Sequence, residues 1–248
     1  MAHELSMNKQ GQVLGRKGQE TRQRLMSATR RLLFTHPLVD ITAVAIAKAA
    51  GTSSASFYMY FDDVQDVLYS LALEAGEDMA KVSLFLEEPW PLDRFEEEAL
   101  RLIEALNGVW SRHREVLRYR NLEADRGDPR FEELRMNTYI PFIERFAKLI
   151  LMVNPAAGSR KKGDAYAEAT VLQAAMERLA STDPVVMERG LGAKRINAAI
   201  ARIVVQTLRS AMAPPAAAQN AAPPRARKPR VAKAVKAVDP VSEGVTTP

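Results

Sequence analysis

The chain has 248 residues, of which 47% are hydrophobic and 26% are charged, so it can bury a core and remain soluble. It contains no cysteine, which excludes disulfide bonds and thiolate chemistry. Its histidines, His3, His36 and His113, are far apart in the sequence and lack the spacing of metal ligands, so we expect no metal and no cofactor.

The net charge of +5 is concentrated at the two ends of the chain. Residues 1–61 hold eight basic and three acidic side chains, residues 214–248 hold six and two, and the segment between them is mildly acidic. Basic ends suit a polyanionic partner, although short basic segments often serve only to keep a protein soluble. No apolar run reaches the roughly 18 residues of a membrane helix, and the polar N-terminus has no signal-peptide core. We therefore expect a cytoplasmic protein without a membrane partner.

Helical periodicity dominates the sequence and no convincing hairpin signal occurs, which predicts an all-α fold. A first helix is expected from about residue 19 to residue 35, where a histidine and a proline end it. One face of this helix is apolar and should be buried; it contains Leu25, Ala28, Thr29, Leu32 and Leu33.

N-capping residues mark the next three helices. Thr42 caps a second helix that runs through residue 50, and Gly51 supplies the turn that follows. Ser53 caps a third helix, and Asp62 or Asp63 caps a fourth that continues to about residue 81.

Pro89 and Pro91 separate these helices from a second helical region. There the apolar spacing predicts helices from about residue 93 to 110, 114 to 126, 131 to 153, 164 to 180 and 193 to 212. We expect a kink at Pro141 and a loop over residues 154–163. From residue 213 the composition becomes rich in Ala, Pro, Lys and Arg, which predicts a disordered tail because little apolar surface can be buried.

The stretch from residue 47 to 61, AKAAGTSSASFYMYF, combines very small side chains with aromatic ones. Two short helices joined by a turn at Gly51 form a helix-turn-helix pattern, whose second helix enters the major groove of DNA. Small residues let such a helix approach closely, while Phe57 and Phe61 lock it against the first helix. The alternative from spacing alone is an αα-hairpin in an ordinary bundle.

Residues 19 to about 79 resemble the DNA-binding domain of the TetR family of bacterial transcriptional regulators. The resemblance rests on the series Ala-Gly-x-Ser-x-x-Ser-Phe-Tyr-x-x-Phe, matched by residues 50–61, and on Leu68 at the position of the family's helix-four leucine. It implies a three-helix helix-turn-helix domain over residues 19–79, preceded by a basic extension, 1–18. A larger helical domain for ligand binding and dimerisation, 80–212, and the tail, 213–248, would follow.

The resemblance also implies which side chains meet DNA. Hydroxyl groups of Tyr58 and Tyr60 would hold the sugar-phosphate backbone, and base discrimination would rely partly on duplex shape. Arg16 and Lys17 would reach the minor groove or a phosphate, or else form a solvated basic leader. The family usually has a lysine where this chain has Val64, so the phosphate contact expected there is in doubt. The expected DNA-binding residues are Arg16, Lys17, Thr42, Lys48, Ser53, Ser54, Ala55, Ser56, Tyr58 and Tyr60.

The larger domain would hold a ligand cavity and the dimer contact. Arg118 and Arg120 could meet an anionic ligand, although arginines on a helix usually form a solvated face. Apolar residues with a few polar atoms are the cavity candidates, and core packing is the alternative for each; they are Leu106, Trp110, Tyr119, Met136, Tyr139, Phe142, Phe146 and Met176. The last two helices carry apolar stripes that would pair across a two-fold axis; the dimer candidates are Ala169, Leu172, Ala175, Ile196, Ile200, Ile203, Val204 and Thr207.

These features favour a dimeric, ligand-responsive transcriptional regulator, a repressor, associated with the bacterial nucleoid. Its partners would be double-stranded DNA with a pseudo-palindromic operator, a small effector of unknown identity and a second copy of the chain. A general DNA-packaging or scaffold protein that uses the basic tail is the alternative. An enzyme is disfavoured because no carboxylate pair, histidine cluster or nucleophile with its base stands out in the sequence.

Overall fold

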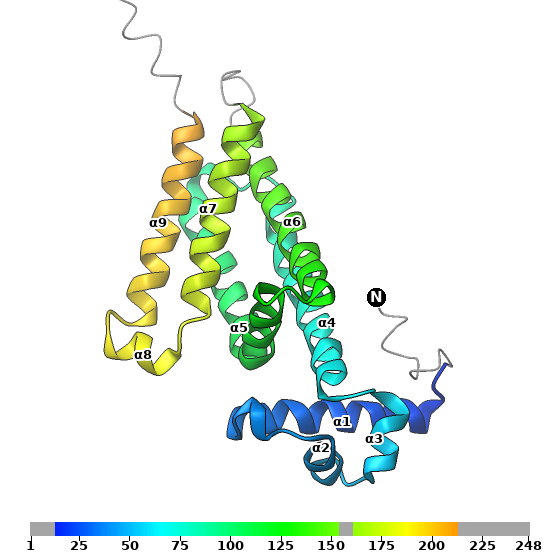
Figure 1. Ribbon diagram of the computed structural model, residues 1–248. Helices are drawn as coiled ribbons and strands as arrows, with labels where there is room; N and C mark the ends of the chain where they lie inside the picture. The colour runs from blue at the N-terminus through cyan, green and yellow to red at the C-terminus, as the bar shows by residue number, and fades with distance from the viewer. Residues whose placement is uncertain (1–12, 154–160, 213–248) are drawn as a thin grey trace, which may run out of the picture. The chain divides into compact units, whose positions relative to one another are not determined.

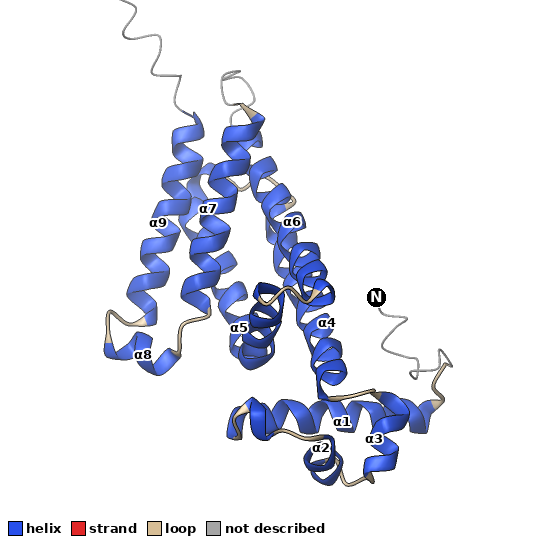
Figure 2. Ribbon diagram, viewed as in Figure 1, coloured by secondary structure: helices blue, strands red, loops and turns tan. Residues whose placement is uncertain are grey.

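A computed structural model describes residues 13–153 and 161–212, and the regular elements within these ranges are all helices (Figures 1 and 2). The predicted all-α fold is therefore confirmed. The expectations for residues 1–12 and for the tail from residue 213 onward lie outside the described residues.

The N-terminal part contains α1 (Arg16–Thr35), the short 3₁₀ helix η2 (Leu38–Asp40), α2 (Ala43–Ala49) and α3 (Ser54–Tyr60). Helix α1 begins three residues earlier than predicted, so Arg16 and Lys17 form its first turn and do not precede it. An ion pair one turn apart, with Nε of Arg16 3.3 Å from Oε1 of Glu20, supports this extra turn.

The predicted N-caps are confirmed. The Thr42 hydroxyl accepts a hydrogen bond from the backbone N–H of Ala45, with N and O 3.1 Å apart. The Ser53 hydroxyl does the same for Ser56 at 3.1 Å, and a carboxylate oxygen of Asp63 accepts from the N–H of Asp66 at 2.8 Å. These bonds pair backbone donors that the first turn of a helix otherwise leaves unsatisfied.

Helix α4 (Val64–Ser83) leads through the 3₁₀ helices η3 (Leu84–Leu86) and η4 (Leu92–Arg94) into α5 (Phe95–Asp125). The predicted division of this last stretch into two helices is confirmed, because α5 consists of two helical segments that meet at a kink at His113, where φ is −121° and ψ is 16°. The chain returns to helical geometry at once, so Trp110 before the break and Leu117 after it are both buried.

The remaining helices are α6 (Pro129–Met152), α7 (Lys162–Ala180), α8 (Pro184–Arg189) and α9 (Ala193–Met212). Helix α6 runs on through Pro141, and α7 begins two residues earlier than predicted. Sequence periodicity missed α8 because six residues are too few to show a helical repeat. Its signal was local: Pro184 occupies the first turn, and the Asp183 side chain caps the N–H of Val185 at 2.7 Å.

Two clusters of buried apolar residues form the interior. The C-terminal core joins α5, α6, α7 and α9 to the second half of α4. The N-terminal core joins α1, α2, α3 and the first half of α4, and it also takes in Val116, Ala124, Phe131 and Leu134 from α5 and α6. Helices α4, α5 and α6 therefore pass through both cores.

Gly76 lies in α4 directly after Ala75, the first residue of this helix that belongs to the C-terminal core. A Cβ atom placed there would meet Oγ1 of Thr138 at 3.4 Å and a methyl group of Leu134 at 3.7 Å, both on α6. The glycine thus sits where α4 and α6 pack closely together, as Figure 1 shows for the two helices.

Candidate functional site

The helix-turn-helix pair is built by α2 and α3, which lie beside α1 (Figure 1). Gly51 makes the turn between them with φ at +67°, a value that side chains other than glycine rarely adopt. Phe57 and Phe61 are fully buried, with ring centroids 5.6 Å apart, as the sequence predicted. The guanidinium group of Arg22 lies 4.9 Å from the Phe61 ring and donates to the Ser70 hydroxyl at 2.9 Å, which ties α1 to α4 behind α3.

Most of the expected DNA-binding residues lie on the surface of this pair. Arg16, Lys17, Thr42, Lys48, Ser53, Ala55 and Tyr58 are exposed, whereas Ser54, Ser56 and Tyr60 are half-buried. Tyr60 packs against the N-terminal core, so its ring is partly used for folding. One exposed residue of α3 was missed: Met59, whose side chain is 62% exposed.

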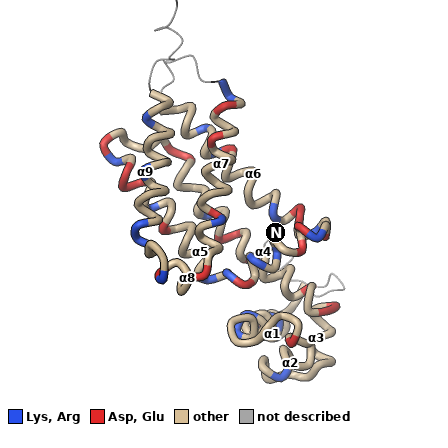
Figure 3. Tube along the Cα trace, turned by 60° about the vertical axis from the view of Figure 1, so that its left-hand side comes forward, with Lys and Arg blue, Asp and Glu red and all other residues tan. Residues whose placement is uncertain are grey.

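The surface of α2 and α3 is almost free of charge. Within residues 41–61 only Lys48 is charged, and the tube through both helices in Figure 3 is accordingly tan for most of its length. Asp62 and Asp63 are exposed directly after α3. Val64, at the position of the family lysine, is half-buried against the N-terminal core, so packing replaces a polar contact there.

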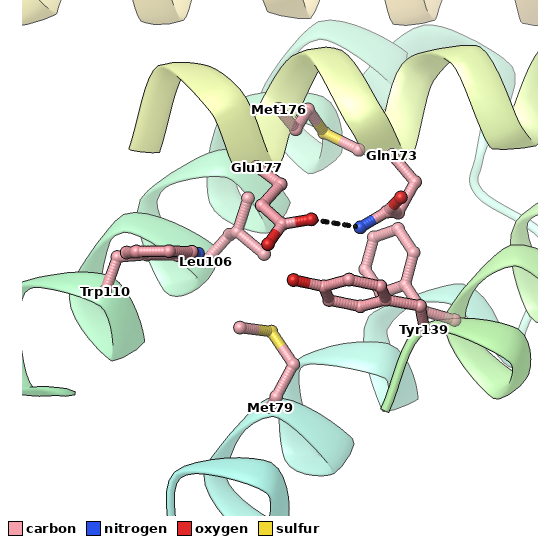
Figure 4. A pocket seen from close by; sticks show the side chains of 8 residues that line it. Met79, Leu106, Trp110, Tyr139, Gln173, Met176 and Glu177 are labelled. Atoms are coloured by element: carbon pink, nitrogen blue, oxygen red, sulfur yellow. Dashed lines mark hydrogen bonds between the residues drawn. The ribbon is translucent and has the colours of Figure 1, made fainter. Parts of the chain in front are cut away.

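A small cavity lies between α4, α5, α6 and α7. The space that a water-sized sphere can enter is about 10 Å³, roughly the room for one water molecule. Figure 4 shows the carboxylate of Glu177 and the hydroxyl of Tyr139 pointing toward one another across it. The lining residues are Met79, Leu106, Trp110, Tyr139, Phe142, Gln173, Met176 and Glu177.

Five of the predicted cavity residues line this space, and three do not. Phe146 is fully buried in the C-terminal core, and Met136 is exposed on α6. Tyr119 packs edge-on against Phe131 of the N-terminal core, with ring centroids 5.4 Å apart, and burial raises the pKa of its hydroxyl to about 12. The sequence missed Met79, Gln173 and Glu177 as lining residues.

A buried polar network stands behind the cavity. Arg120 is fully buried, and its Nη2 donates to the Tyr139 hydroxyl and, at 2.9 Å, to the side-chain oxygen of Asn121. The two carboxylate oxygens of Glu177 each accept a hydrogen bond, one from the Asn121 amide at 2.9 Å and one from the Gln173 amide at 3.1 Å. Oε1 of Glu177 also lies 3.7 Å from Nη2 of Arg120. Arg120 is therefore not on a solvated face.

Burial shifts both ionisable groups of this network. It lowers the pKa of Arg120 to about 10, still well above neutral pH, and it raises the pKa of Glu177 against the opposing effect of the Asn121 hydrogen bond and the Arg120 charge. The Nη1 atom of Arg120 has no hydrogen-bond partner among the described residues.

The dimer candidates divide between the subunit's own core and its surface. Ala169, Leu172, Ile200 and Val204 are buried in the C-terminal core, which corrects their assignment as residues that await a partner. Ala175 and Ile203 are exposed, and Ile196 and Thr207 are half-buried. Val171, which was not among the predicted dimer residues, is 68% exposed on α7, the neighbour of α9.

Within the described ranges no helix is long and apolar enough to cross a membrane. The same residues contain no group of three or more His, Cys, Asp or Glu side chains placed to hold a metal ion.

Comparison with known proteins identifies the fold family. A family model described as tetracyclin repressor-like, C-terminal domain, matches residues 83–212, which is more than half of the chain. The chain belongs to the TetR family. The TetR resemblance of residues 19–79 and the family match of the larger helical region therefore agree, although they rest on different residues.

Solved structures of TetR-type regulators share this fold. A regulator of the TetR/AcrR family from Thermobifida fusca YX-ER1 has a TM-score of 0.57 at 18% identity, over 74% of this chain and 96% of that chain. The fatty acid degradation regulator FadR from Bacillus halodurans has a TM-score of 0.54 at 18% identity, over 79% and 96%. Among curated protein sequences none matches this one significantly.

Proposed function

We propose that this TetR-family protein is a sequence-specific DNA-binding repressor that acts as a homodimer. A small effector would change its affinity for DNA. The observation that supports this most directly is the α2–α3 pair. A glycine turn sets the angle of α3, two phenylalanines hold it against the core, and its outer face is open and free of negative charge. That combination suits insertion of a helix into the major groove.

The flanking residues would fix the position of α3 on the duplex. Thr42 and Tyr58 expose hydroxyl groups, Lys48 exposes an ammonium group, and Arg16 and Lys17 expose charge at the start of α1. Contacts of this kind go to phosphates and orient a protein without selecting its sequence. The protein would act in the bacterial cytoplasm, where its operator lies.

The dimer contact would use the outward faces of α7 and α9. Val171 and Ala175 on α7 and Ile203 on α9 present apolar surface that the subunit itself does not cover. Pairing these faces across a two-fold axis would place two copies of α3 on one pseudo-palindromic operator.

The effector would occupy the cavity beside Met79. In its present form this space has room for about one water molecule, so a ligand must displace side chains. Met79 and Met176 are flexible and can move at low cost. A largely apolar ligand with one polar group, placed near Glu177 and Tyr139, fits the lining. Because Met79 belongs to α4, which also enters the N-terminal core, such a ligand would act on the DNA-binding helices through α4.

The decisive experiment compares two exposed alanines. Genomic DNA fragments that the full chain retains are sequenced, and their affinity is measured for Ala55→Glu on α3 and for Ala80→Glu on α4. Both changes add one negative charge, but only the first puts it on the proposed DNA surface. We expect Ala55→Glu to lose at least tenfold in affinity and Ala80→Glu to stay near wild type.

A chain that ends at residue 213 separates this proposal from the packaging alternative. A regulator keeps a sequence-specific footprint without the basic tail, whereas a packaging protein loses nearly all its affinity. Equal losses for both glutamate variants, or no common sequence among the retained fragments, would count against the regulator. The proposal assigns the protein no enzymatic activity.

A further inference from the structure

We infer that Met59 and Ala55 read the methyl group of thymine in the major groove of the operator. This inference rests on the proposed function, since it assigns a base to the outer face of α3, and it goes beyond it by naming the chemical group that is recognised.

The two residues occupy the centre of the outward face of α3. At about 100° per residue, positions two before and two after Phe57 both lie about 160° from it around the helix axis. Phe57 is fully buried, while Ala55 is exposed and Met59 is 62% exposed. Ala55 and Met59 are also four residues apart, so their side chains are neighbours on one surface. A partner that binds the face of α3 opposite Phe57 therefore contacts these two residues first.

Polar base reading is weak on this face. Residues 50–61 contain no Arg, Lys, Asn, Gln, Asp or Glu, the side chains that pair with guanine, adenine or cytosine edges through specific hydrogen bonds. The serine hydroxyls at positions 53 and 56 both donate and accept, so they discriminate poorly among bases. Ser53 is in addition engaged as the N-cap of α3.

An apolar surface in the major groove has one apolar group to meet there, the C5-methyl group of thymine. Ala55 is small enough to bring the helix backbone close to the base edge. The thioether chain of Met59 is long, unbranched and easily reoriented, so it can follow the position of the methyl group.

The charge of the surroundings agrees with DNA as the occupant. Lys48 is the one charged residue of positions 41–61, so the two helices bring no negative charge to a polyanion. The exposed hydroxyl groups of Thr42 and Tyr58 lie on the same two helices and suit phosphate oxygens. Asp62 and Asp63 follow α3 and set the limit of the surface on that side.

The test replaces thymine by uracil, which differs only in lacking the methyl group. An operator is first selected from random duplex DNA with the full-length chain, and each thymine is then exchanged singly for uracil in a binding titration. Burial of one methyl group is worth about fourfold in affinity. We expect one thymine in each half-site to show a loss of about fourfold, and about fifteenfold when both half-sites are changed.

Two methionine variants test whether the loss of affinity on exchange of thymine for uracil depends on Met59. In Met59→Ala the ratio of thymine to uracil affinity should fall toward one, while in Met136→Ala, an exposed methionine on α6, it should equal the wild-type ratio. The inference is overturned if every exchange leaves wild-type affinity within twofold, or if Met59→Ala keeps the full ratio. Failure to enrich any sequence would instead overturn the proposed function and this inference with it.

Discussion

Nε2 of His113 lies 3.0 Å from a carboxylate oxygen of Asp78, at the residue where α5 departs from helical geometry. Asp78 is on α4, next to Met79 of the cavity, and its carboxylate also accepts a hydrogen bond from Nζ of Lys81 at 2.8 Å. The break in α5 is thus held to α4 by a polar contact, one residue before Met79, which lines the space proposed for the effector.

The first prediction concerns this contact and pH. Hydrogen bonds from Lys81 and then His113 lower the pKa of Asp78 from an ordinary 3.8 to about 2. A carboxyl group with a lowered folded-state pKa stabilises the fold above its ordinary pKa, and this contribution is lost as pH falls from about 4 to 2. Asp78→Asn should therefore lower the free energy of unfolding by about 1 kcal/mol at pH 7 and by little at pH 2. The effect at pH 7 is modest because the group is partly exposed to solvent.

Urea unfolding at several pH values measures this difference. Asp93→Asn, at an exposed position of η4, is the matched control and should leave the pH dependence unchanged. A constant stability difference between wild type and Asp78→Asn from pH 7 to pH 2 would contradict the assignment.

Ser53 allows folding and DNA binding to be separated. Ser53→Ala removes the N-cap of α3 and should lower the free energy of unfolding by about 1 kcal/mol. Ser53→Asp restores a cap, so its stability should match wild type, yet its carboxylate would repel the duplex and lower DNA affinity. Thermal unfolding measures the stability of the two variants, and operator titration measures their DNA affinity. If stability and affinity change in parallel in both variants, folding and DNA binding are not separable at this residue.

Two glycines should respond to alanine in opposite directions. Gly76→Ala should stabilise the protein by about 0.5–1 kcal/mol, because an added Cβ finds ordinary contact distances to Thr138 and Leu134 and alanine favours a helix interior. Gly51→Ala should destabilise it by about 1 kcal/mol, since φ there is +67°. Denaturant midpoints report both effects, and a destabilising Gly76→Ala would mean that α4 and α6 cannot adjust.

The buried network should behave as a coupled unit. Arg120→Met leaves the Glu177 carboxylate without its nearby charge and should cost about 3–5 kcal/mol. Combining it with Glu177→Met removes both charges, so the double variant should lose less than the sum of the two single variants. A double-mutant cycle by urea unfolding measures this coupling, and strict additivity would show that the two residues act independently.

The surface of α9 should decide the oligomeric state. Ile203 is 52% exposed, so Ile203→Glu should leave the subunit folded but convert the proposed dimer to a monomer. Ile200 is buried in the C-terminal core, so Ile200→Glu should unfold the subunit instead. Sedimentation velocity with circular dichroism distinguishes the two. A folded Ile203→Glu dimer would show that the interface lies elsewhere.

Features that depend on a few neighbouring residues were predictable from the sequence. The caps at Thr42 and Ser53 follow from hydroxyl side chains placed before a helix, and the inward orientation of Phe57 and Phe61 follows from helical spacing. The apolar repeat of α9 likewise predicted a stripe, but it did not show that Ile200 and Val204 pack inside the subunit and not against a second copy.

Features that depend on which helices meet were not predictable. An apolar stripe shows that a side chain is buried but not against which partner, and the buried residues of α5 belong to two cores. Tyr119 therefore faces the N-terminal core while Trp110 faces the cavity. Arg120 also falls on this stripe, three residues after the buried Leu117, but only its contacts with Asn121 and Tyr139 show how a charge is accommodated there.

The sharing of helices between the two cores has a practical result for dissection of the molecule. A polypeptide cut after residue 79 would sever α4 and would remove Val116, Phe131 and Leu134 from the N-terminal core, to which Phe57 and Leu68 belong. Such a peptide should be partly unfolded and prone to aggregate, and it should not reproduce the structure of this region in the intact protein. Structural work on the proposed DNA complex should accordingly keep the chain whole through α9.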